Sequence, residues 1–118
     1  MATTSFAELD AYIECALWSS PSGTDEAEFM DGIDAELAEE TWATMRTDVL
    51  LFIAANAGDL LDMDPEQVGH DLWLTRNRHG AGFFDRGLGE RGERLTRAAQ
   101  ALGERTLYLG DDGLIYMM

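Results

Sequence analysis

The sequence predicts an α+β fold that is mostly α, with about four helices and a C-terminal β-hairpin. Apolar residues recur at three- and four-residue spacing in several separate stretches, as in helices that bury one face. Near the end of the chain, two short apolar runs flank a Gly-Asp-Asp-Gly turn, which is typical of a hairpin. With 118 residues, 46% of them apolar and 26% charged, we expect a single globular domain over residues 1–118.

The first helix is expected to begin after Ser5 and to end near Trp18. Ser5 and Glu8 have the spacing of a capping box, in which the hydroxyl binds a first-turn amide and the carboxylate reaches back. Its apolar stripe comprises Phe6, Leu9, Ile13 and Leu17. Residues 24–40 have few apolar side chains and predict an irregular segment with at most a short helical turn.

A second helix is expected from about Ala38, with Gly58 as its C-terminal cap. Its buried face is predicted to comprise Trp42, Met45, Val49, Phe52 and Ile53. The third helix begins at Asp64 and Pro65, a capping acid followed by the residue that best suits the first helical position, and it runs to about Leu74.

Residues 75–89 contain four glycines and predict an ordered loop. The last helix is expected over residues 90–102, ending at Gly103. Its acids and arginines stand four residues apart, as in Glu90 with Arg94, which favours ion pairs along the helix. The hairpin pairs residues 106–109 with 114–117 and needs the helices to pack against, since an isolated hairpin is marginal in water.

Charge is distributed unevenly along the chain. There are 23 acids and 8 bases, every base is arginine, and the net charge is −15. Residues 1–71 hold 17 acids and one arginine, whereas residues 72–118 hold 6 acids and 7 arginines. A surface this negative repels nucleic acid and anionic membranes and attracts proteins with basic sites. We therefore expect a basic protein or nucleoprotein complex as partner, with no direct binding of nucleic acid or membrane.

The acids are densest in the segment of residues 25–40, which contains no base. Wound as a helix, sixteen residues span about 24 Å, so the charges approach the phosphate spacing of about 3.4 Å along one DNA strand. We predict that this segment binds the partner, supported by Asp59, Asp62, Asp64 and Glu66. The alternatives are an acidic face that only keeps the protein solvated, or adaptation to high salt. The predicted partner-binding residues are Asp25, Glu26, Glu28, Asp31, Asp34, Glu36, Glu39 and Glu40.

A second candidate site follows the third helix, where cationic and amide side chains precede a Gly-Ala-Gly turn. Such a stretch has the composition of a cationic nest for a phosphate or another anion. The possible ligand-loop residues are Arg76, Asn77, His79, Gly80, Gly82, Asp85 and Arg86. The structural alternative is that charged side chains pair to fix a glycine-rich connection above packed aromatic residues. That alternative involves Asp71, Arg76, Asp85 and Arg86 over Trp73, Phe83 and Phe84.

Catalysis and metal binding are not expected. His70, Asp71, His79 and Asp85 have no zinc or iron spacing, and no nucleophile and base are ordered into a triad. The single cysteine, Cys15, permits no internal disulfide and is expected to be an inert thiol. We predict a protein without cofactor, metal or enzymatic activity. The start of the chain has neither a secretion signal nor a membrane span, which predicts a cytoplasmic location.

The most distinctive motifs are HDLWLTRN at residues 70–77, HGAGF at 79–83, DR at 85–86 and LYLGDDG at 107–113. Over residues 64–117 these motifs resemble a family of small acidic proteins encoded by bacteriophages and prophages. The resemblance implies a bacterial host cell as the location. It also favours a counter-defence role, since small acidic phage proteins include DNA mimics and inhibitors of CRISPR or restriction complexes.

The predicted function is therefore that of a non-enzymatic, acidic inhibitor that binds a basic DNA-handling surface of a host defence complex, of the DNA-mimic, anti-CRISPR or anti-restriction type. Two alternatives remain open. One is a small-ligand or nucleotide-binding phage protein that uses the loop between Arg76 and Arg86. The other is a structural phage protein whose charge serves only solubility.

Overall fold

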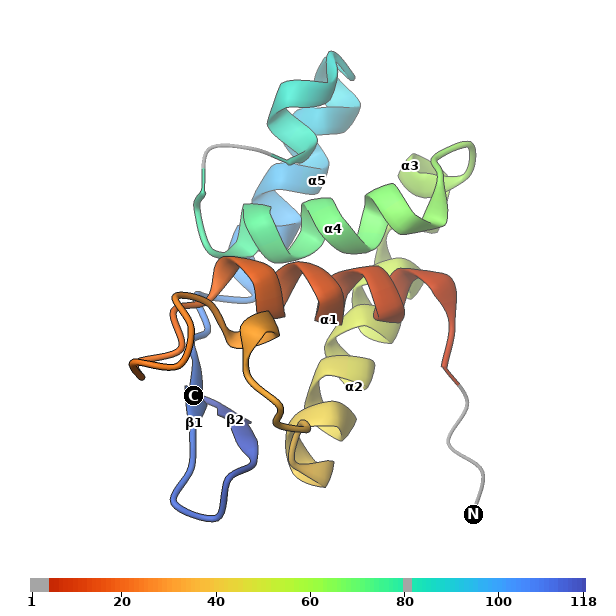
Figure 1. Cartoon of the computed structure of the whole chain (residues 1–118). Coiled ribbons are helices and arrows are strands. Elements are labelled where there is room, and N and C mark those ends of the chain that lie inside the picture. The colour runs from red at the N-terminus through yellow and green to blue at the C-terminus, as the bar shows by residue number, and fades with distance from the viewer. Residues whose placement is uncertain (1–4, 80–81) are drawn as a thin grey trace.

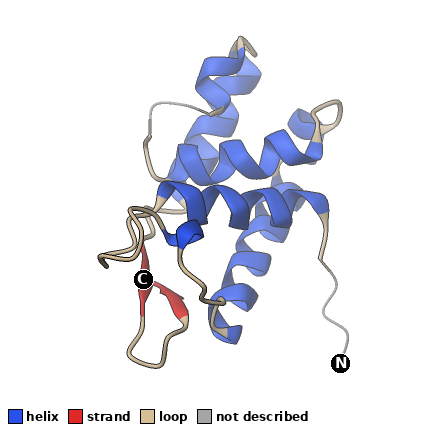
Figure 2. Ribbon diagram, in the orientation of Figure 1, coloured by secondary structure: helices blue, strands red, loops and turns tan. Residues whose placement is uncertain are grey.

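The computed structural model describes residues 5–79 and 82–118, and it confirms the predicted class, α+β and mostly α (Figure 1). Within these residues, five α-helices and two 3-10 helices precede a two-stranded antiparallel hairpin. The elements are α1 (Ala7–Ser19), η1 (Met30–Gly32), α2 (Glu39–Ala55), α3 (Ala57–Leu60), α4 (Pro65–Arg76), η2 (Phe83–Arg86), α5 (Glu90–Ala101), β1 (Leu107–Leu109) and β2 (Ile115–Met117). Figure 2 shows the strands at the C-terminal end of an otherwise helical fold.

The centre of the fold is the pair α1 and α4, which lie side by side (Figure 1). Gly69 permits this close approach, because a Cβ atom at that position would lie 2.0 Å from the carbonyl oxygen of Glu8. The side of α1 that faces the core differs from the predicted stripe. Of the predicted stripe, Leu9 is buried, and Phe6, Ile13 and Leu17 are only half-buried. The buried residues of α1 are Leu9, Tyr12, Cys15 and Ala16.

Aromatic pairs connect the other elements to this centre. Tyr12 meets Trp73 of α4 edge to face, with ring centroids 5.3 Å apart. Phe52 of α2 stacks on Phe83 of η2 at 5.7 Å. Trp73 is buried and Trp42 is half-buried, whereas Trp18 is 41% exposed and lies against His70.

Several predicted helix ends are confirmed and two are wrong. Asp64 caps α4 as expected, its carboxylate accepting the backbone N–H of Gln67 at 3.1 Å. The capping box at Ser5 does not form, because that hydroxyl donates to the carboxylate of Asp10 and Phe6 occupies the N-cap. Gly58 does not cap α2, which ends at Ala55 with Asn56 as its C-cap, and instead lies within the short helix α3.

The hairpin has the predicted position, with Tyr108 opposite Tyr116 in the register. It is attached to the segment that precedes α2 through a parallel bridge between Leu37 and Ile115. Leu107 and Ile115 are buried, so the hairpin contributes one side of the core. This attachment fixes the end of the acidic segment relative to the helices.

Candidate partner-binding surface

The eight acids predicted to bind a partner are all exposed. They lie on three successive pieces of backbone: a turn between α1 and η1, then η1 with the extended stretch that follows it, and the first turn of α2. The structure therefore places every one of these carboxylates in contact with solvent, as a partner-binding role requires.

A buried serine organises the first piece. Ser22 is 4% exposed, and its backbone N–H donates to the carbonyl of Glu28 at 3.0 Å. Its hydroxyl donates to the carbonyl of Ala27 and accepts the backbone N–H of Thr24 at 3.1 Å. Pro21 and Phe29 pair across the turn. Asp25, Glu26 and Glu28 thus project from a closed turn that main-chain bonds hold in one shape.

The second piece is held by the core and by the hairpin. Met30, the first residue of η1, is 1% exposed and anchors the chain in the core. Further along, the N–H of Ile115 donates to the carbonyl of Glu36, and the N–H of Ala38 donates back to the carbonyl of Ile115, each at 2.9 Å. Asp34 and Glu36 are exposed, whereas the apolar residues that alternate with them are half-buried.

This geometry corrects the predicted helical spacing of the charges. Apart from η1, the backbone from residue 25 to residue 38 is not helical. In an extended chain, alternate residues lie about 6.6 Å apart, so Asp34 and Glu36 are more widely spaced than a helical segment predicts. The acids form a surface of separated carboxylates rather than a single row at the phosphate spacing.

Among the described residues, none of these eight acids takes part in an ion pair. The four ion pairs join Asp48 to Arg76, Asp71 to Arg86, Asp62 to Arg91 and Asp59 to Arg94. The pairs expected along the last helix do not appear in this set, because Asp59 of α3 and Asp62, which follows α3, pair with arginines of α5. A hydrogen bond from Arg94 lowers the pKa of Asp59 below its ordinary value. Asp59 and Asp62 are therefore engaged and do not extend the acidic surface.

A groove between α1 and α4 adds carboxylates that sequence reasoning did not bring together. It is an open depression of about 630 Å³, and its acids are Asp10, Glu14, Asp64 and Glu66. The first two come from α1 and the last two from the start of α4. Only the close packing of these helices at Gly69 makes them neighbours, and no spacing within either helix signals that contact.

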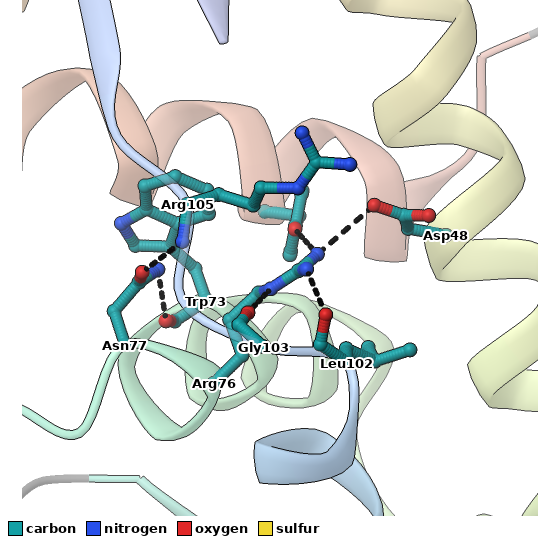
Figure 3. A network of polar contacts seen from close by, with 8 residues as sticks. Asp48, Trp73, Arg76, Asn77, Leu102, Gly103 and Arg105 are labelled. Carbon is teal, nitrogen blue, oxygen red and sulfur yellow. Dashed lines mark hydrogen bonds and ion pairs between the residues drawn. The ribbon is translucent and has the colours of Figure 1, made fainter. Parts of the chain in front are cut away.

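Arg76, one of the two arginines of the predicted ligand loop, lies in the core (Figure 3). Arg76 is 1% exposed, and its guanidinium donates to Tyr12 and Asp48 and to the carbonyls of Leu102 and Gly103, each at 2.9 Å. These bonds join α1, α2 and the end of α5 to α4. The arginine predicted to bind an anion is thus used to hold the helices together.

Asn77 has a similar internal role. Its side-chain amide donates to the carbonyl of Trp73 at 3.0 Å, and its side-chain oxygen accepts the backbone N–H of Arg105 at 2.8 Å (Figure 3). His79 is exposed three residues after the end of α4, and Gly80 lies outside the described residues. Among the described ligand residues, Asn77 and His79 line one depression and Arg86 lines another, so the structure does not bring these three side chains to one site.

The remaining residues of the predicted ligand loop confirm in part the alternative that charged side chains pair to fix a glycine-rich connection over packed aromatic residues. Asp71 is fully buried and accepts two hydrogen bonds from Arg86, at 2.8 and 3.1 Å. Gly82 lies so close to α4 that a Cβ atom there would be 2.2 Å from the Thr75 hydroxyl. Phe83 is buried as expected, but Phe84 is 74% exposed. Asp85 is exposed and joins no ion pair among the described residues.

Other chemistry is limited in the part of the chain that the structure describes. Burial raises the pKa of the Cys15 thiol to about 12, so little nucleophilic thiolate forms near neutral pH. Residues 5–79 and 82–118 contain no cluster of three or more His, Cys, Asp or Glu side chains suited to a metal ion. None of the described helices combines the length and apolar character of a membrane span.

The chain matches no family model, no curated protein and no solved structure.

Proposed function

We propose that this protein is a non-enzymatic, acidic inhibitor that binds a basic DNA-handling surface of a bacterial defence complex, in the manner of a DNA mimic. The observation that carries the proposal is the state of the eight acids of residues 25–40. All are exposed, and none is in an ion pair among the described residues. A partner that supplies arginine and lysine side chains would provide the counter-charges that this segment lacks.

The fixed backbone of the segment supports binding. Because Ser22, Met30 and Ile115 hold the chain by bonds and contacts that do not use the carboxylates, the acids are presented in a defined arrangement before the partner arrives. Preorganised groups lose less conformational entropy on binding than groups on a flexible chain. Charge complementarity of this kind speeds association and makes binding weaken as salt increases.

The residues that resemble the phage and prophage family favour a defence complex as the target. In this chain those residues build the fold, since Arg76 and Asp71 are buried in ion pairs. They indicate the source of the protein and leave the binding role to the acidic surface. DNA-binding sites of nucleases and defence complexes are lined by basic side chains that neutralise phosphates, and these are the groups that the acidic surface complements.

Two quadruple variants with the same change in charge test the proposal. The first neutralises acids of the segment: Asp25→Asn, Glu26→Gln, Asp34→Asn and Glu36→Gln. The matched control neutralises exposed acids elsewhere: Glu90→Gln, Glu93→Gln, Glu104→Gln and Asp111→Asn. Each tagged protein is incubated with bacterial lysate at low salt, eluted with high salt, and assayed for inhibition of DNA binding by the eluted complex.

The wild type and the control are expected to retain a DNA-handling complex and to block its binding to DNA, while the first variant loses both properties. Equal losses in the two variants would show that total charge, and not this surface, is responsible. Retention of no DNA-handling protein by the wild type would also contradict the proposal.

A further inference from the structure

A small pocket lies between the start of α2 and the hairpin, with a volume of about 150 Å³. Its lining combines one carboxylate, one guanidinium, two threonine hydroxyls and two phenol rings. These side chains are Glu40, Thr41, Thr44, Arg105, Tyr108 and Tyr116. Three of them come from the first turns of α2, and three come from the hairpin and the chain that leads into it. The pocket therefore exists only where two segments far apart in the sequence meet.

The first observation that points to a ligand is the state of Arg105. This residue is half-buried, and its guanidinium takes part in no ion pair or hydrogen bond among the described residues. Its backbone N–H donates to Asn77, while the guanidinium points away from that residue (Figure 3). In a chain with 23 acids, a guanidinium that pairs with no described carboxylate is available to an anionic group from outside the chain.

The second observation is the hydroxyl of Thr41. This residue is only 3% exposed, and its hydroxyl forms no hydrogen bond among the described residues. Within residues 5–79 and 82–118, no side-chain oxygen or nitrogen is both shut off from solvent and without a hydrogen bond. The Thr41 hydroxyl therefore reaches solvent, and it does so in the pocket that this residue lines. An almost buried hydroxyl without a partner is placed to bond a ligand that enters the pocket.

The other groups of the pocket suit a cation. Glu40 is exposed and joins no ion pair in the described part of the chain, so its carboxylate lacks a counter-charge. Tyr108 stacks on Tyr116 with ring centroids 5.7 Å apart, yet it remains 42% exposed. An open aromatic face beside a carboxylate attracts an ammonium group, above all a methylated one. The pocket thus offers an anion partner and a cation partner within one small volume.

We propose that this pocket binds a small zwitterion, a compound of amino-acid size that carries one carboxylate and one ammonium group. The carboxylate meets Arg105 and the Thr41 hydroxyl, and the ammonium meets Glu40 and the face of Tyr108. A simple anion would be repelled by Glu40, and a simple cation would be repelled by Arg105. A zwitterion uses both charges and adds nothing to the net charge of −15. Glu40 and Arg105 do not pair with each other, which leaves the space between them to the ligand.

An NMR titration of the full chain tests this proposal, with glycine betaine, acetate and choline added separately at constant ionic strength. Acetate has only the anionic group of glycine betaine, and choline has only its cationic group. Glycine betaine should shift the side-chain N–H signal of Arg105 and saturate in the millimolar range, since a small pocket contacts few ligand atoms. Acetate and choline should bind at least about tenfold more weakly, because each lacks one of the charged contacts.

Two substitutions with matched controls locate the site. Glu40→Gln and Arg105→Gln each remove one charge from the pocket and should weaken the binding of glycine betaine at least about fivefold. Glu39→Gln makes the same change in the same turn of α2 but outside the pocket, and Arg97→Gln removes an exposed arginine of α5. Both controls should bind glycine betaine like the wild type. Thr41→Val keeps the shape of the pocket, removes its buried hydroxyl and should also weaken binding.

The amide spectrum of each variant establishes that it is folded. A wild type that shows no saturable shift up to about 100 mM glycine betaine overturns the proposal. Acetate or choline that binds as tightly as glycine betaine also overturns it, since the site would then be one for an anion or a cation alone. Equal losses in the pocket variants and in their controls would show that the shifts do not come from this pocket.

Glycine as a second probe separates the two sources of this chemistry. Tighter binding of glycine betaine assigns a methylated ammonium to the face of Tyr108, and tighter binding of glycine assigns an amino acid to Glu40; either result supports a zwitterion site. The test of the proposed function changes four other acids and leaves Glu40 and Arg105 intact. Failure of the inhibitor proposal and failure of the zwitterion proposal are therefore distinguishable.

Discussion

Substituting methionine for Arg76 tests whether its buried guanidinium holds the end of α5 against the other helices. The side chain is 1% exposed and donates four hydrogen bonds, each of 2.9 Å. Two of the acceptors are the carbonyls of Leu102 and Gly103, where α5 ends and the chain turns toward the hairpin. Methionine retains the apolar stem and leaves these acceptors without a donor.

The expected loss in the free energy of unfolding depends on whether each acceptor finds a new donor in Arg76→Met. A buried acceptor without a partner costs about 1–3 kcal/mol, and removing one member of a buried ion pair costs about 3–5 kcal/mol. Asp48 is 20% exposed and can recover water, so the losses do not add fully. We expect the free energy of unfolding to fall by about 3–5 kcal/mol, out of the total of about 6–18 kcal/mol usual for a chain of this length.

Urea denaturation at neutral pH measures this loss. With a slope near 2 kcal/mol/M, the midpoint should fall by about 2 M. Arg97→Met is the control, since Arg97 lies exposed on α5 and joins no ion pair among the described residues, and its stability should change by less than about 0.5 kcal/mol. If Arg76→Met and Arg97→Met unfold at the same urea concentration, the buried network does not hold the fold together and the reasoning fails.

Two further predictions concern α1. Gly69→Ala should lower the free energy of unfolding by about 1–3 kcal/mol or more, because its Cβ atom would meet the backbone of Glu8. Gly58→Ala has open space around it and should raise the free energy of unfolding by about 0.5–1 kcal/mol. Thermal melts that order the two variants otherwise would contradict the close helix contact. Burial raises the pKa of Tyr12 from 10.0 to about 12, so the folded state holds the phenolic proton more tightly than the unfolded state does. This stabilisation is complete below about pH 10 and is lost as pH rises from there to about 12. Across that range the urea midpoint should fall steeply with pH in the wild type and less steeply in Tyr12→Phe. Equal dependence of the midpoint on pH in the two proteins would refute the role of Tyr12.

Local signals in the sequence were sufficient for most of the fold. The Asp64-Pro65 start of α4, the end of α5 before Gly103 and the hairpin turn depend on residues close together in the chain, and all three were predicted correctly. The inner face of α1 was not, because it depends on which helix packs there. Periodicity favoured Phe6, Ile13 and Leu17, whereas the face that packs beside α4 buries Tyr12, Cys15 and Ala16 next to Leu9.

The same distinction separates the two candidate sites. Exposure of the acidic segment was predictable, because unpaired carboxylates cannot be buried at acceptable cost. The role of Arg76 was not, because its partners lie 64, 28, 26 and 27 residues away along the chain. A run of arginine, asparagine and histidine has the same composition whether it binds an anion or holds helices together. Only the position of Tyr12 and Asp48 decides between these uses.

The placement of the arginines bears on why the acidic segment stays unneutralised. Four of the eight arginines pair with acids outside it, although residues 25–40 carry the strongest mutual repulsion. The segment is instead held by backbone bonds from Ser22 and Ile115, which involve no carboxylate. Apart from Glu39 and Glu40, which favour the N-terminus of α2, its acids thus add repulsion without supporting the fold, a pattern expected where function is retained at the expense of stability. Neutralising them should leave the protein as stable or more so, and a loss of partner binding in that variant then reports on the surface and not on unfolding.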